Sequence, residues 1–154
     1  MKVKLGEAVP DFAAPSTGGD FRLSEARGAP LLIYFYPKDN TSGCTAESQD
    51  FAIAHRHFAE SGTRIVGVSR DSMQSHFGFK RKLDLPFELI VDGDEQLCEL
   101  FGVIRNKTMY GKLVRGIERS TFLLDQNGIL RREWRAVSVP GHVEETLAAV
   151  RALR

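Results

Sequence analysis

Cys44 is the residue of this chain best placed for covalent chemistry. It follows a polar loop, Lys38 to Gly43, and stands at the beginning of a segment with helical spacing. The thiolate is the nucleophilic form of cysteine, and the unpaired backbone N–H groups and positive dipole end of a helix N-terminus favour it over the thiol. This position favours a reactive cysteine over a buried structural thiol.

Two further side chains are predicted to share space with Cys44. Thr41 precedes it by three residues and can direct a hydroxyl group toward it. The alternative for Thr41 is a helix cap or turn residue. Arg119 stands at the beginning of a predicted strand that should run antiparallel beside the strand leading to Cys44. A guanidinium there would favour the thiolate and offer forked donors to two adjacent oxygen atoms. The alternative for Arg119 is a surface ion pair.

The elements that would position these residues follow from the hydrophobic pattern. The apolar run 31–36 predicts a buried central strand, ended by Pro37. A helix over about 45–61 and a second buried strand over 64–69 complete a parallel βαβ unit. The remaining expectations are an N-terminal hairpin turning at 17–20, a helix capped by Asp71 or Ser72 and running to about Leu83, a strand at 88–91, a short helix at 94–101, a loop-like stretch at 102–117, strands at 120–125 and 129–135, and a final helix at 142–153.

This order predicts an α/β chain with a thioredoxin-like fold. An N-terminal hairpin precedes the βαβ half, and an insertion separates that half from the ββα half. One domain should span residues 1–154, a length typical of a single core. Open α/β sheets bind ligands at the carboxyl ends of their parallel strands, which is where the loop before Cys44 lies.

Composition excludes several other classes of protein. The chain has 21 Lys and Arg against 20 Asp and Glu, so it lacks the basic excess of a nucleic-acid-binding protein. No apolar run approaches the length of a membrane span, and the start MKVKLGEAVPDF lacks the apolar segment of a signal peptide. Two distant cysteines are not a secreted disulfide framework, so we expect a cytoplasmic protein. The four histidines do not have the spacing of a metal site, and no metal is expected.

Several stretches of the chain resemble one enzyme family. Pro37-x-x-x-Thr41-x-x-Cys44 resembles the PxxxTxxC signature of peroxiredoxins, and YFYPKDNTSGCTAES is similar to the PrxQ subfamily, also called bacterioferritin comigratory protein. Matching stretches run from LGEAVPDFAAP through GIERSTFLLDQNG to VPGHVEETLAAV. The resemblance covers almost the whole chain. It implies a thiol-dependent peroxidase that reduces hydrogen peroxide and organic hydroperoxides without a cofactor.

The resemblance also implies a role for each residue of the motif. Cys44 attacks the terminal peroxide oxygen and becomes a sulfenic acid. Thr41 and the Cys44 backbone N–H hold the peroxide, and Arg119 orients it and stabilises the charge on the leaving oxygen. Pro37 shields Cys44 from water. Glu47 matches the CTxE of the family and braces Arg119 or the loop, although a first-turn acid also has a helix-dipole explanation.

Two departures from the family pattern affect the loop and the recycling step. Ser42 replaces a usual proline, which costs loop stiffness. Many relatives carry a resolving cysteine five residues after the nucleophile, where this chain has Gln49. We therefore predict a one-Cys cycle recycled by thioredoxin, glutaredoxin or glutathione. Cys98, which we interpret mainly as a packing residue, is the other candidate, and it would make an atypical two-Cys enzyme.

Two other functions remain open at this point. A disulfide oxidoreductase of the same fold would need a CxxC pair, which Cys44 lacks. A redox sensor or holdase could use oxidation of Cys44 to signal to a partner. We expect a monomer, with a weak homodimer as the alternative, and no nucleic-acid or membrane partner.

Overall fold

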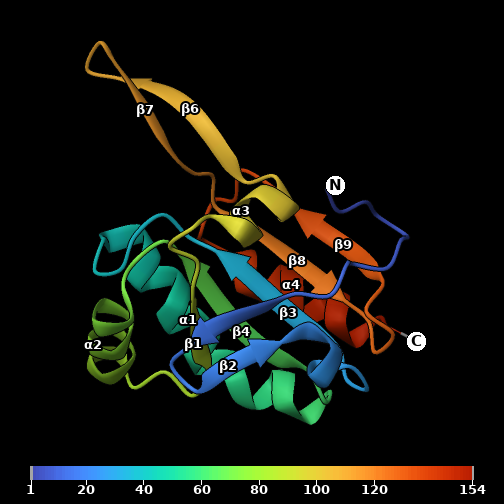
Figure 1. Cartoon of the computed structure of the whole chain (residues 1–154). Coiled ribbons are helices and arrows are strands. Elements are labelled where there is room, and N and C mark those ends of the chain that lie inside the picture. Colours follow the sequence, from blue (N-terminus) through green and yellow to red (C-terminus); the bar gives the residue numbers. More distant parts are fainter. Residues whose placement is uncertain (1, 154) are drawn as a thin grey trace.

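A seven-stranded sheet forms the centre of the protein, with strand order β2-β1-β5-β4-β3-β8-β9 (Figure 1). The computed structural model describes residues 2–153. The strands of this sheet are β1 (Ala13–Ser16), β2 (Gly19–Arg22), β3 (Leu31–Phe35), β4 (Arg64–Ser69), β5 (Glu88–Val91), β8 (Ser120–Leu124) and β9 (Leu130–Trp134). The helices are α1 (Ser42–Glu60), α2 (Met73–Leu83), α3 (Gln96–Phe101) and α4 (His142–Arg151), with a 3-10 turn η1 (Leu23–Ala26).

The pairing of β3 fixes the place of the predicted site. β3 runs parallel to β4, with Leu31 opposite Arg64, and antiparallel to β8, with Phe35 opposite Ser120. Both pairings confirm the predicted thioredoxin-like arrangement. Because β8 begins where β3 ends, Arg119 lies beside the loop that leads into α1.

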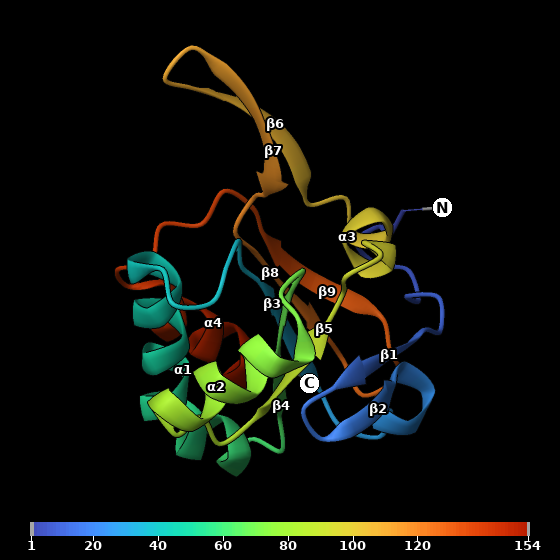
Figure 2. The same ribbon diagram turned by 60° about the vertical axis from the view of Figure 1, so that its left-hand side comes forward.

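The two faces of the sheet are covered by different elements (Figure 2). The side chains of β3 alternate, as expected of a strand buried on both faces. Leu32, Tyr34 and Tyr36 pack in the cluster that includes residues of α1, α2 and α4, whereas Leu31, Ile33 and Phe35 pack with the N-terminal segment and α3. The central sheet therefore separates two hydrophobic cores.

Helix boundaries follow local capping chemistry. α2 begins as expected after Ser72, whose hydroxyl accepts a 3.1 Å hydrogen bond from the backbone N–H of Ser75. α1 begins at Ser42, three residues before the predicted start at Thr45. The helix starts earlier because Thr41 is already its N-terminal boundary residue and Ser42 its first helical residue. Cys44 is consequently the third residue of α1 and still lies in its first turn.

The expectation of a loop-like stretch at 102–117 was wrong. β6 (Ile104–Met109) and β7 (Lys112–Ile117) form an antiparallel hairpin that is a sheet of its own. Its turn has Tyr110 and Gly111 at the two central positions, both with positive φ. Tyr-Gly is not among the usual hairpin-turn pairs, and the strands are mostly exposed, so neither turn chemistry nor alternation pointed to it. Figure 1 shows the hairpin projecting from the end of the sheet at which β3 terminates.

Among residues 2–153, no helix is both long enough and apolar enough to cross a membrane.

Candidate active site

Cys44 lies in the first turn of α1, at the carboxyl end of the central strand. Its side chain is only 1% exposed and packs in the same cluster as Tyr34 and Tyr36 of the β3 segment and Phe51 of α1. The first intrahelical bond here runs from the Thr45 N–H to the Thr41 carbonyl, so the helix itself leaves the Cys44 N–H unpaired. The sulfur is therefore buried beside the unpaired N–H groups of the first turn of α1.

Arg119 connects Cys44 to a buried carboxylate. Its Nη2 lies 3.4 Å from the Cys44 sulfur, and its Nη1 donates a 2.8 Å hydrogen bond to Oε1 of Glu47. The Arg119 side chain is 16% exposed and that of Glu47 is fully buried. The guanidinium is therefore held in one orientation by Glu47, with its other nitrogen directed at the nucleophile. The predicted approach of Arg119 to Cys44 and of Glu47 to Arg119 is present in the structure.

Glu47 must be buried to hold Arg119 in this orientation. The pKa of Glu47 is raised from an ordinary value of 4.5 to about 7, mainly by burial and also by the nearby charge of Asp50, although the ion pair with Arg119 acts in the opposite direction. Its second oxygen, Oε2, has no hydrogen-bond partner among the described residues. A carboxylate with only one of its oxygens paired does not recover its hydration energy on burial. Glu47 is therefore an ionisable group that titrates close to neutral pH.

Thr41 and Pro37 lie on the solvent side of the site, and both are exposed. The hydroxyl of Thr41 donates a 2.8 Å hydrogen bond to the carbonyl of Lys38, and it does not cap α1. Since its one proton is committed, this hydroxyl presents only lone pairs to a ligand. It can accept a hydrogen bond from the O–H of a hydroperoxide.

Gly43 allows the guanidinium to approach the helix. A Cβ at this position would lie 3.1 Å from Nη2 of Arg119, the nitrogen that faces the Cys44 sulfur. Any side chain here would push that nitrogen away by a few tenths of an ångström. The sequence motif gives no signal for this role, because the contact comes from a strand distant in the sequence.

A buried polar network fixes the loop that precedes Cys44. Asp39 accepts hydrogen bonds from the Tyr36 hydroxyl at 2.7 Å, from Ser75 at 2.8 Å and from Nδ1 of His76 at 2.8 Å. The other ring nitrogen of His76, Nε2, lies 2.8 Å from the carbonyl of Ile90, which can only accept. Nε2 therefore donates to this carbonyl, and the buried His76 ring links α2 both to Asp39 in the loop and to β5.

The pKa of Asp39 agrees with these hydrogen bonds. Burial acts to raise it, but hydrogen bonds from His76 and Tyr36 outweigh burial and hold the pKa below its ordinary value. The network ties the active-site loop to α2 and to the end of β5. Sequence reasoning missed Asp39 and His76, since nothing in their spacing indicates that the fold brings them together.

The same network contains a grouping that resembles a metal site. Ligand atoms of Asp39, Asp71 and His76 lie within 4.8 Å of one another. Asp71 accepts the backbone N–H of Asp39 at 2.9 Å, and both ring nitrogens of His76 are already engaged, with Asp39 and with the Ile90 carbonyl. The donor set does not fit a metal ion.

Cys98 lies on the other side of the sheet from Cys44. It is fully buried in the cluster that contains Phe35 and Phe101, whereas Cys44 belongs to the cluster that contains Tyr34 and Tyr36. Its backbone N–H donates to Asp92, and burial, followed by the neighbouring Asp92, raises the pKa of the Cys98 thiol well above its ordinary value. The structure gives Cys98 the surroundings of an unreactive packing residue and does not bring it to Cys44.

His142, at the start of α4, is the histidine on the Arg119 side of the site. Burial lowers its pKa to about 4, opposed by Glu145 and assisted by the charge of Arg119. Its Nε2 lies 2.8 Å from the hydroxyl of Thr121. His142 is neutral at neutral pH, so it adds no second cation beside Cys44.

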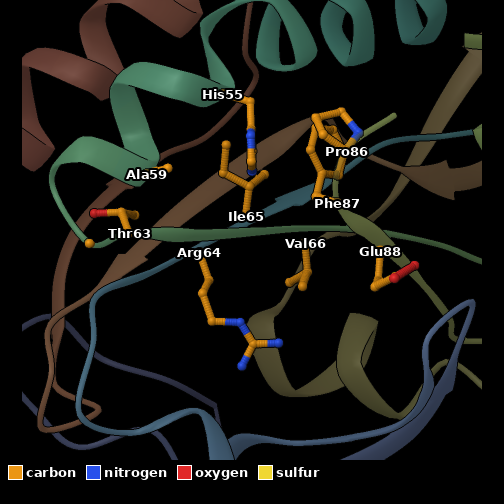
Figure 3. Close-up of a pocket in the computed structure, with 10 residues that line it drawn as sticks. His55, Ala59, Thr63, Arg64, Ile65, Val66, Pro86, Phe87 and Glu88 are labelled. Carbon is orange, nitrogen blue, oxygen red and sulfur yellow. The ribbon is translucent and has the colours of Figure 1, made fainter. Parts of the chain in front are cut away.

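One cavity among the described residues lies away from this site. A cavity of about 380 Å³ is lined by the end of α1 and the start of β4, at the sheet edge opposite Cys44. Figure 3 shows His55 and Arg64 on opposite sides of the β4 ribbon. Arg64 packs over the ring of Phe21, and Glu88 is engaged with Thr17 and Lys80. Of the polar side chains that line the cavity, Thr63 has a buried hydroxyl without a hydrogen-bond partner among the described residues.

The fold and the site together define a thiol peroxidase of the thioredoxin-like class, with a helix-opening cysteine and an arginine presented from the antiparallel neighbour of the central strand. Residues 5–133 match the model of the AhpC/TSA family. The chain is 45% identical over 152 residues to peroxiredoxin Bcp of Bacillus subtilis, covering 98% of this chain and 97% of that protein. It is 50% identical over 151 residues to peroxiredoxin Bcp of Xanthomonas campestris, covering 97% and 94%.

Solved structures agree with these sequence matches. A structure of the Xanthomonas campestris bacterioferritin comigratory protein, described with its alkyl peroxide reduction activity, superposes with a TM-score of 0.90 at 47% identity and covers 97% of this chain and 96% of that one. Xylella fastidiosa PrxQ gives a TM-score of 0.92 at 38% identity, covering 99% and 98%. The chain belongs to the AhpC/TSA family and is a peroxiredoxin of the Bcp/PrxQ type, a thiol-dependent hydroperoxide reductase.

We expect Gly43→Ala to slow peroxide reduction by about tenfold or more, because the new methyl group displaces the Arg119 nitrogen that faces Cys44. The matched control is Gly78→Ala in α2, where a Cβ meets nothing within 4 Å. Both substitutions should raise helix stability slightly. Single-turnover rates with hydrogen peroxide compare the two variants, and equal rates would show that Gly43 has no such role.

Glu47 should make the free energy of unfolding fall as the pH rises between about 4.5 and 7, because the folded protein then keeps a proton that the unfolded chain has released. In a Cys44→Ser background, Glu47→Gln should reduce that decline by an amount on the order of 2 kcal/mol. Urea unfolding at pH 5 and pH 8 measures it. An unchanged decline would contradict the raised pKa.

His76→Leu should destabilise the protein by about 3–5 kcal/mol, because it leaves the Asp39 carboxylate buried without its His76 partner. The matched control is His57→Leu, on the exposed side of α1, which should change the free energy of unfolding by no more than about 0.5 kcal/mol. Urea unfolding measures both variants. Similar small effects in the two would mean that the Asp39–His76 pair does not fix the loop.

Proposed function

We propose that this peroxiredoxin reduces hydrogen peroxide and alkyl hydroperoxides through a one-Cys cycle at Cys44, recycled by an external thiol. The observation that carries the proposal is the placement of the two cysteines, with Cys44 beside Arg119 on one face of the sheet and Cys98 buried on the other. A second support is the position five residues after Cys44, which holds the exposed, non-thiol side chain of Gln49.

The first half of the cycle uses the geometry around Arg119. The Cys44 thiolate attacks the terminal oxygen of ROOH, the O–O bond breaks, and the products are the Cys44 sulfenic acid and RO⁻, which takes up a proton and leaves as ROH. Thr41 accepts a hydrogen bond from the peroxide O–H, and the Cys44 N–H donates to the peroxide. The Arg119 nitrogen that faces the sulfur stabilises the charge that moves onto the leaving oxygen.

The second half returns Cys44 to the thiol. A small thiol or a thioredoxin-type protein attacks the sulfenic acid, forms a mixed disulfide and releases water. A second thiol then attacks the mixed disulfide. This frees the Cys44 thiol and leaves the reductant as a disulfide. A disulfide between Cys44 and Cys98 would require their Cα atoms to come within about 7 Å. The β3 strand and its neighbours stand between the two residues, so that step needs large local unfolding.

The intact mass of the oxidised protein tests the one-Cys cycle. One equivalent of hydrogen peroxide should add one oxygen, and the product should react with dimedone, because no internal thiol reaches the sulfenic acid. Cys98→Ser should keep the thiol-supported turnover of the wild type. Cys44→Ser should abolish turnover and leave the fold intact.

Two results would overturn this cycle. A loss of two hydrogens with a mapped Cys44–Cys98 disulfide, together with loss of thioredoxin-supported turnover in Cys98→Ser, would make the protein an atypical two-Cys enzyme. Oxidation of Cys44 without repeated turnover in the presence of dithiothreitol would favour a redox sensor.

A further inference from the structure

The hairpin of β6 and β7 stands apart from the rest of the protein (Figures 1 and 2). Its two strands pair only with each other among the described residues. The base is anchored: Glu118 N–H donates to the Val103 carbonyl at 2.7 Å, and Arg115 pairs with Glu95 of the α3 segment. An isolated two-stranded ribbon is marginally stable in water. The contacts at the base therefore stabilise a hairpin that has no hydrophobic core of its own.

The free end of the hairpin carries exposed apolar side chains. Met109 is 50% exposed, Tyr110 98%, Leu113 73% and Val114 43%. These are four of the seven large apolar side chains that are exposed within residues 2–153. Apolar side chains gathered at one projecting place indicate an interaction site, whereas single ones scattered over a surface are ordinary.

The turn places an aromatic ring at the tip at some conformational cost. Tyr110 has φ +53° and Gly111 has φ +75°, which is the pattern of a two-residue primed turn. Glycine, asparagine or aspartate normally occupies the first of these positions, and a bulky residue there is strained. Strain of this kind is retained where the side chain has a use. A smaller residue would make a more stable turn but would leave no ring at the outermost point.

The charges on the hairpin have one sign. Residues 104–117 contain two arginines and two lysines and no aspartate or glutamate. The arginines lie near the base, where Arg115 pairs with Glu95 and Arg105 with Glu118. Lys107 and Lys112 lie nearer the tip, and neither has a carboxylate within ion-pairing distance among the described residues.

We propose that the β6–β7 hairpin docks this peroxiredoxin on an anionic lipid surface. An apolar tip with a tyrosine ring, backed by lysines whose long stems can reach the headgroups, matches the change from acyl chains to anionic headgroups at a bilayer surface. A second copy of the chain is a poor occupant, because it would bring two cationic fingers together. The expectation of no membrane partner rested on the lack of a spanning segment, and peripheral docking does not need one.

The position of the hairpin gives docking a consequence for the active site. β7 ends at Ile117, two residues before Arg119. A cavity of about 190 Å³ lies between Pro37 and the hairpin, where it is lined by Met109, Val114, Gly116 and Ile117 and by Arg105 and Lys107. Pro37 borders the approach to Cys44. A surface bound at the tip would therefore lie on the same side of the molecule as that approach.

Vesicle binding tests the proposal directly. The full chain should co-sediment with phosphatidylcholine vesicles that contain phosphatidylglycerol, bind far more weakly to pure phosphatidylcholine, and be released at about 1 M salt, where the Debye length is about 3 Å. The double variants Tyr110→Ser/Leu113→Ser and Lys107→Ser/Lys112→Ser should each lose roughly tenfold or more in partitioning. The matched controls are Ile53→Ser on α1, whose side chain is 81% exposed, and Lys82→Ser on α2.

The outcomes separate this proposal from other occupants and from catalysis. All four variants should reduce hydrogen peroxide at the wild-type rate, since none lies in the catalytic machinery. Equal binding to neutral and anionic vesicles, or tip variants that bind like Ile53→Ser, would overturn the proposal. So would self-association that Leu113→Ser removes in sedimentation velocity without any vesicle binding, because the occupant would then be a second copy.

Discussion

The guanidinium of Arg119 contacts two groups at once: the sulfur of Cys44 and the fully buried carboxyl group of Glu47. A free arginine side chain would sample many rotamers, and Glu47 selects the one that directs a nitrogen at Cys44. This arrangement buries the carboxyl group of Glu47. Mainly because of burial, its pKa is raised to about 7, and its second oxygen has no hydrogen-bond partner among the described residues. Glu47 is therefore better understood as a positioning residue than as a source of stability.

The rest of the fold keeps this contact in register. β3 and β8 must pair antiparallel, with Phe35 opposite Ser120, for Arg119 to arrive beside the first turn of α1. Gly43 must lack a side chain for the guanidinium to come close. The pair of Asp39 and His76 fixes the other end of the loop against α2 and β5. Each of these features holds backbone or side chains still near a sulfur that has to meet its substrate in one geometry.

The two-sided packing of the sheet also shapes the redox chemistry. Because Cys98 lies in the core between the sheet and α3, the proposed one-Cys cycle leaves the Cys44 sulfenic acid without an internal thiol within reach. A long-lived sulfenic acid needs an external reductant and is exposed to further oxidation at excess peroxide. The β6–β7 hairpin stands at the same end of the sheet as the active-site loop. The proposed docking of this hairpin would place peroxide reduction at a lipid surface.

The sequence alone determined the parts of this protein that depend on local pattern. The apolar run 31–36, the strand 64–69 and the turn at 126–128 specify a thioredoxin-like order. The resemblance of Pro37–Thr41–Cys44 to a family motif predicts a peroxidatic cysteine at a helix entrance. Even Arg119 followed from topology, since antiparallel strands bring the start of one beside the end of the other. Only the tertiary structure decided the rest. It decided the Asp39–His76 pair, the Gly43 contact and the separation of Cys44 from Cys98, which involve residues with no periodic relation in the sequence. It also decided the exposed hairpin, whose alternation of polar and apolar residues is too weak to predict two strands. Periodicity reports which face of an element is buried, but it does not report which distant side chain that face will meet.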